Sequence, residues 1–68
     1  MNKLEEAEQA YEKTVALKPD HAEAHYSLGV FYELHRKDMP RALAQYQKYR
    51  ELGGRDERVE RILGAGLP

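Results

Sequence analysis

The residues best able to do chemistry in this 68-residue chain are two histidines four positions apart, His21 and His25. On a helix this spacing places both imidazole rings on one face, as in helical zinc sites. A zinc protease needs a glutamate directly after the first histidine, but Glu23 lies two positions along, roughly 200° around the helix. No third ligand stands at a predictable position. The sequence therefore predicts that His25 packs against a neighbouring helix, that His21 is solvated, and that no metal or cofactor binds.

Five tyrosines and one phenylalanine form a second group, which could stack on the bases of single-stranded nucleic acid. Most of them fall at helical spacing on apolar stripes, so we expect them in the core. The chain has 11 basic and 12 acidic residues, a balance that gives no electrostatic hold on phosphates. Arg36, Lys37 and Arg41 gather near Asp38, which predicts a solvated turn. We therefore expect no nucleic-acid partner.

Candidate catalytic groups are sparse. Neighbouring carboxylates such as Glu5 and Glu6 point to different sides of a helix and do not form an acid/base pair. The chain has no cysteine, and neither Ser27 nor Thr14 has a plausible base beside it. We predict that the protein is not an enzyme.

Helical periodicity and its punctuation divide the chain into four segments. Pro19 ends the first, because proline cannot donate the next backbone hydrogen bond, and Asp20 followed by Glu23 forms a capping box for the second. Gly53-Gly54 closes the third. No apolar run approaches the roughly 18 residues that a membrane span needs, so we expect a soluble chain with no membrane partner. The predicted helices are about 2–18, 21–36, 39–52 and 56–63, an all-α fold.

The apolar stripes of these helices give the expected core. Gly29 lies within the second stripe, and we expect it to be small because it and Ala7 let the first two helices approach closely. The stripe residues are Leu4, Ala7, Tyr11, Thr14, Val15 and Leu17; then Ala24 or His25, Leu28, Phe31, Tyr32 and His35; then Ala42, Leu43, Tyr46, Tyr49 and Leu52; and finally Val59, Ile62 and Leu63.

A shift of 35 residues places the chain on itself. A fixed period of this size is typical of proteins whose small repeated units bury their apolar faces by stacking on one another. We therefore expect function on a surface rather than in a catalytic pocket. The shift places Leu4 on Met39, Ala7 on Ala42, Tyr11 on Tyr46, Lys13 on Lys48, Leu17 on Leu52, and Leu28-Gly29 on Leu63-Gly64.

These residues resemble the tetratricopeptide repeat (TPR) family, whose unit is a helix pair of about 34 residues. The resemblance implies an antiparallel helix-turn-helix repeat array, an α-solenoid fragment of about one and a half to two repeats. It also implies a single domain over residues 1–68, within a longer repeat protein. The matches are Leu28-Gly29 and Tyr32 for the first helix of a unit, Ala42 and Tyr46 for the second, and Ala7, Tyr11 and Pro19 for the second helix of a preceding unit.

The sequence departs from the family pattern in several places. His25 stands where tryptophan is usual, Tyr49 where a small residue is common, and Gly54 where a proline closes the unit. The connection between the two helices of the central unit is also one residue longer, and we place that residue in the turn 35–38. The third motif is then a divergent, terminal one.

In the family, the first helix of each pair lines a concave groove that receives peptides or partner domains. By that resemblance the chain is a non-catalytic protein-protein interaction scaffold. Family members that clamp the carboxyl-terminal tails of heat-shock chaperones use lysine, arginine and asparagine on this surface. None of the residues expected to face the groove in this chain is of these types, which disfavours clamping of chaperone tails. The residues expected to face the groove are Glu23, Tyr26, Ser27, Val30, Glu33 and Leu34.

A structural role stays open as the alternative. The segment would then extend or cap a longer superhelix, and its open faces would mediate self-association. The face of the first helix that bears Leu4, Tyr11 and Val15 has no predicted cover within the chain, which predicts a homodimer through that helix. Exposure of the groove residues in the full-length parent would favour the binding role. The cellular compartment is unknown.

Overall fold

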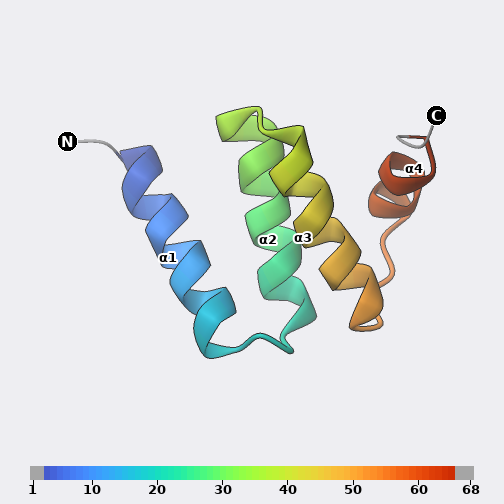
Figure 1. Ribbon diagram of the computed structural model, residues 1–68, viewed down its shortest axis with the longest axis horizontal. Coiled ribbons are helices and arrows are strands. Elements are labelled where there is room, and N and C mark those ends of the chain that lie inside the picture. The colour runs from blue at the N-terminus through green and yellow to red at the C-terminus, as the bar shows by residue number, and fades with distance from the viewer. Residues whose placement is uncertain (1–2, 66–68) are drawn as a thin grey trace.

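The computed structural model describes residues 3–65. Within these residues the chain forms four α-helices. They stand in a row and alternate in direction, as Figure 1 shows. No strand occurs in the described part of the chain, so the predicted all-α repeat array is confirmed. The predicted start at residue 2 lies outside the described residues. The elements are α1 (Lys3–Leu17), α2 (Ala22–Phe31) with a π-helical turn η1 (Tyr32–Arg36), α3 (Met39–Glu51) and α4 (Glu57–Ala65).

The start of α2 differs from the prediction. The N-cap residue is His21, whose backbone is extended and whose Nδ1 accepts a hydrogen bond from the backbone N–H of Ala24 at 3.3 Å. The capping box expected from Asp20 and Glu23 is therefore wrong. An imidazole nitrogen serves here as the acceptor that a carboxylate or hydroxyl usually provides at this position.

The end of the α2 segment also differs, because the predicted helix 21–36 changes type after Phe31. The backbone N–H groups of Lys37 and Asp38 both donate to the carbonyl of Tyr32, and Lys37 takes a left-handed conformation with φ of 55°. A π-helical turn holds more residues than an α-helical one. The extra residue expected in the turn 35–38 is thus accommodated within the helix, and His35, predicted in the buried stripe, is exposed.

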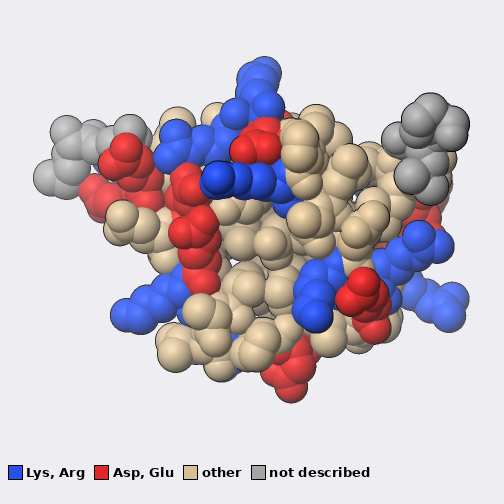
Figure 2. Space-filling view, in the orientation of Figure 1, with Lys and Arg blue, Asp and Glu red and all other residues tan. Residues whose placement is uncertain are grey.

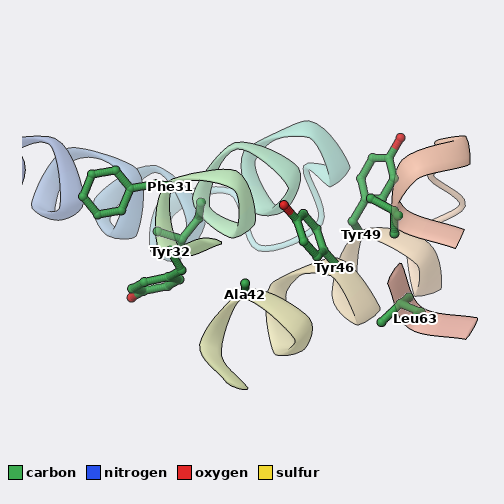
Figure 3. Close-up of a cluster of buried hydrophobic side chains, with 8 residues drawn as sticks. Phe31, Tyr32, Ala42, Tyr46, Tyr49 and Leu63 are labelled. Atoms are coloured by element: carbon green, nitrogen blue, oxygen red, sulfur yellow. The ribbon is translucent and has the colours of Figure 1, made fainter. Parts of the chain in front are cut away.

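The hydrophobic core lies between α2, α3 and α4. Its residues extend from Phe31, on the side of α1, to Leu63 of α4, with Tyr46 between α2 and α3 (Figure 3). Burying each large apolar side chain contributes about 1.5–3 kcal/mol to folding. The buried cluster consists of Leu28, Phe31, Tyr32, Ala42, Tyr46, Tyr49, Val59 and Leu63.

Helix α1 contributes no fully buried residue. Ala7 and Val15 are half-buried and pack against the cluster, but Tyr11 is 38% exposed and Leu17 is 72% exposed. The apolar stripe predicted for residues 2–18 is therefore only partly covered. The periodicity of the stripe identifies an apolar face of the helix. That face becomes fully buried only when helices on both flanks cover it.

Two glycines provide room for aromatic rings of α3. A Cβ atom on Gly29 would lie 2.6 Å from Cε1 of Tyr46, so this glycine admits α3. The expected close contact between Gly29 and Ala7 of the first helix is wrong. A Cβ atom on Gly54 would likewise overlap the ring of Tyr49. Two departures from the family pattern, a large Tyr49 and a glycine in place of proline, thus compensate for each other.

Candidate functional site

The six residues expected to face a groove lie on α2 and η1, at the surface. They differ in exposure, because the turns of α2 that face α3 use some of the same side chains in packing. Leu34 is the most open of the apolar ones, with 54% of its surface exposed. Glu23 and Leu34 are exposed, and Tyr26, Ser27, Val30 and Glu33 are half-buried.

Tyr26 and Val30 also support the core. The ring of Tyr26 lies 6.0 Å from that of Tyr46 and 5.1 Å from that of Tyr49, measured between centroids. Val30 packs against the same cluster. Aromatic pairs at these separations stabilise by about 0.5–1.5 kcal/mol beyond their buried area. Substitutions at these two positions will therefore change the stability of the fold as well as the binding of any ligand.

Glu33 is held by two other helices. Its Oε1 accepts a hydrogen bond from the Tyr46 hydroxyl at 2.7 Å, and its Oε2 accepts one from Nη2 of Arg58 at 2.7 Å. Arg58 also donates through Nη1 to the Tyr46 hydroxyl at 3.4 Å. Burial, assisted by the hydrogen bond to Glu33, raises the pKa of Tyr46 to about 12. The carboxylate is therefore a fixed group where η1, α3 and α4 meet.

Arg58 is the residue that sequence reasoning missed at this site. It stands on α4, 25 positions from Glu33, and the ion pair it forms cannot be found by helical spacing. The internal repeat holds a usable clue, since the 35-residue shift places Arg58 on Glu23, one of the expected groove positions. Arg58 thus connects α4 to one residue of the expected groove.

A second polar network joins α1 to η1 and α3. Glu8 accepts from Nη2 of Arg36 at 2.6 Å and from its Nε at 2.7 Å. Arg41 lies 3.4 Å from a carboxylate oxygen of Asp38. The basic cluster predicted to be a solvated turn therefore has two of its three side chains paired with carboxylates. The Arg36–Glu8 pair holds η1 against α1, whereas the Arg41–Asp38 pair lies at the start of α3.

Tyr32 strengthens the same junction. Its hydroxyl donates to Oε2 of Glu12 at 2.6 Å, and the guanidinium carbon of Arg41 lies 5.8 Å from the centre of its ring. Burial, together with the hydrogen bond to Glu12, raises the pKa of Tyr32 to about 12. The hydroxyl therefore stays protonated and acts as a fixed donor that joins η1 to α1.

The two histidines are used separately. His25 is buried, with Nε2 2.8 Å from the carbonyl oxygen of Pro19 and Nδ1 2.8 Å from Oε1 of Gln45. His21 is exposed and caps α2. Both placements agree with the prediction, and the contacts explain why an imidazole stands where the family has tryptophan. Across residues 3–65, no three ligand-type side chains gather closely enough to hold a metal ion.

Charged side chains of both signs are mixed over the face drawn in Figure 2, and the middle of that face is mostly uncharged. A mixed surface does not attract a polyanion as a single-sign patch does. Within the described part of the chain, no helix has the length and apolar character to cross a bilayer. The hollow lined by Arg50, Asp56 and Glu60 lies at the connection between α3 and α4 and shares no residue with the expected groove.

Comparison with known protein families gives a match. The family model described as tetratricopeptide repeat matches residues 1–57, which cover α1, α2, η1 and α3. The curated proteins and the solved structures give no match.

Proposed function

The chain belongs to the tetratricopeptide repeat family, and from this premise we propose that it is a non-catalytic scaffold whose α2 face receives a peptide or partner domain. The observation that carries the proposal is Leu34, which is 54% exposed on the same helical turn as Glu33, a carboxylate fixed by Tyr46 and Arg58. An open apolar side chain on the same turn as a rigid polar group is suited to anchoring a partner side chain and fixing its orientation.

The chemistry of the strip defines the ligand class. Val30 and Leu34 lie four positions apart and offer an apolar contact. Arg58 compensates the charge of Glu33, whereas Glu23 is exposed at the beginning of the same helix. We therefore propose a segment with an apolar side chain for the Leu34 end and a lysine or arginine toward Glu23.

A peptide-display selection on the immobilised 68-residue chain tests this function. Selected peptides should bind the unchanged chain and a Gln47→Glu control, which alters an exposed residue of α3 outside the strip. They should bind Leu34→Glu at least about tenfold more weakly, because a charge replaces the apolar contact. Exposed substitutions usually change stability by no more than about 0.5 kcal/mol, and circular dichroism will verify that each variant folds.

Two results would contradict the proposal. One is a selection that yields no binding peptide. The other is a set of peptides that bind Leu34→Glu as tightly as the unchanged chain, which would place the binding surface elsewhere. A Glu23→Gln variant adds detail, since loss of its charge should weaken only those peptides that carry a basic residue.

A further inference from the structure

The two end helices correspond to the two halves of the central helix pair. Helix α4 repeats α2, because the 35-residue shift places Leu63-Gly64 on Leu28-Gly29. Helix α1 repeats α3, because the same shift places Tyr11 on Tyr46. Within residues 3–65 the pair is complete only in α2 and α3. Helices α1 and α4 are single members of such pairs in this part of the chain.

The complete pair shows what each half needs. Tyr46 is fully buried, and its ring occupies the space that a side chain on Gly29 would fill. The ring of Tyr26 covers it further, with centroids 6.0 Å apart. Gln45 reaches back to His25 of α2. A glycine opposite a tyrosine is thus the central contact of this pair.

Helix α1 has the tyrosine without the glycine. Tyr11 packs on Phe31 at 5.6 Å between centroids, yet 38% of it is exposed, against 0% for Tyr46. Ala10, at the position of Gln45, is exposed as well. This face of α1 is open where the equivalent face of α3 is closed.

Helix α4 has the glycine without the tyrosine. Gly64 is exposed, and a Cβ atom built on it would meet nothing within 4 Å. Leu63 beside it is already buried against the core, so α4 uses one face for α3 and leaves the Gly64 face open. Arg61, at the position of Tyr26, has 72% of its side chain exposed.

The two open faces cannot meet within one molecule, because α1 and α4 stand at opposite ends of the row in Figure 1. The beginning of α1 and the end of α4 do lie at the same edge of that row, at the top of the view. The end of the α2 segment and the beginning of α3 also lie there. An α4 helix therefore has the direction required to pair with the α1 helix of a neighbouring molecule as α2 pairs with α3.

We propose that copies of this chain associate head to tail, with α4 of one copy packed on α1 of the next, so that Gly64 lies over Tyr11. Arg61 then replaces Tyr26 beside the tyrosine ring, a favourable cation–π arrangement. Symmetric pairing through α1 would instead place Tyr11 against Tyr11, two large rings where the α2–α3 contact has one ring and a glycine. Because a head-to-tail contact uses two different surfaces, it adds copies without limit unless a ring closes.

Sedimentation velocity over a concentration series of the unchanged chain tests the proposal. The mass should rise beyond that of a dimer as concentration increases. Gly64→Leu fills the open face of α4, and Ala10→Glu places a carboxylate on α1 opposite Glu60, which corresponds to His25. Each substitution alters an exposed position, so each should leave the monomer folded and weaken association by at least about tenfold. Gln47→Leu, which adds an equal side chain on exposed α3, should associate like the unchanged chain.

Mixing the two blocked variants decides between modes of pairing. Gly64→Leu retains an open α1 face and Ala10→Glu retains an open α4 face, so an equimolar mixture should form a dimer and stop there. A chain that is monomeric at every concentration would overturn the proposal. So would a dimer that persists in Gly64→Leu, which indicates symmetric pairing through α1, or a mixture that stays monomeric.

Discussion

Helices α1 and α3 carry alanine and tyrosine at equivalent repeat positions, yet these residues are fully buried only on α3. Helix α3 has 13 residues, of which Ala42, Tyr46 and Tyr49 are buried, whereas α1 has 15 residues and none is buried. The difference arises from their neighbours, since α3 packs against both α2 and α4 while α1 packs against α2. In a repeat array the contribution of a helix to stability is thus set by how many flanking helices it has.

The largest expected effect compares the two equivalent tyrosines. Tyr46→Ala should lower the free energy of unfolding by about 3–5 kcal/mol, because it empties a fully enclosed site. Tyr11→Ala should cost roughly 1 kcal/mol, because its ring is only partly enclosed. Urea unfolding followed by circular dichroism, at concentrations where the chain is monomeric, measures both. Similar losses in the two variants would contradict the comparison.

The next effect compares the two equivalent glycines. Gly29→Ala should destabilise the fold by about 1–3 kcal/mol, because the new methyl group would overlap the enclosed ring of Tyr46. Gly64→Ala should stabilise an isolated molecule by up to about 1 kcal/mol, because alanine favours a helix and no atom is near. Thermal melting distinguishes the two. A Gly29→Ala variant that melts at or above the temperature of the unchanged chain would disprove the assigned contact.

The smallest effect is confined to alkaline solution. Burial, with the hydrogen bonds to Glu12 and Glu33, raises the pKa of Tyr32 and Tyr46 from 10.0 to about 12. Because the folded state binds these protons more tightly, the stability they contribute is complete below pH 10 and is lost as the pH rises through 12.

Single substitutions separate the two tyrosines that cause this loss. The urea midpoint of unfolding should decline with rising pH. Tyr46→Phe should remove the part of this decline that is due to the hydroxyl of α3, and Tyr32→Phe the part that is due to the hydroxyl bonded to α1. Urea midpoints measured between pH 10 and pH 12 provide the comparison. An unchanged slope in both variants would show that neither hydroxyl titrates as described.

The helices and their order could be predicted because proline, glycine and apolar spacing are local features of the sequence. The neighbour of each apolar face could not, and Gly29 is the plainest case. Its small size predicts a close approach, but only the three-dimensional arrangement shows that the approaching residue is Tyr46 of α3 rather than Ala7 of α1. Local spacing identifies a face, whereas packing selects what covers it.

The candidate surface could be predicted to the same extent. The family resemblance assigns the expected groove residues to the second helix, and Leu34 among them is exposed. The ion pair of Glu33 with Arg58 and that of Glu8 with Arg36 could not be predicted, because their members lie 25 and 28 positions apart and meet only when the helices pack. Long polar side chains have many alternative partners in the sequence, and tertiary structure selects among them.

The π-helical turn at Tyr32–Arg36 has a consequence for aligning this chain with other repeats of its family. A residue added to an α-helix would rotate every later residue by about 100° around the axis. Here the wider π-helical turn accommodates the added residue. Arg36 therefore lies within reach of Glu8, and Asp38 caps the beginning of α3. An alignment that puts the gap in the loop after Arg36 will therefore treat residues 32–36 as α-helical and place His35 in the buried stripe, although His35 is exposed.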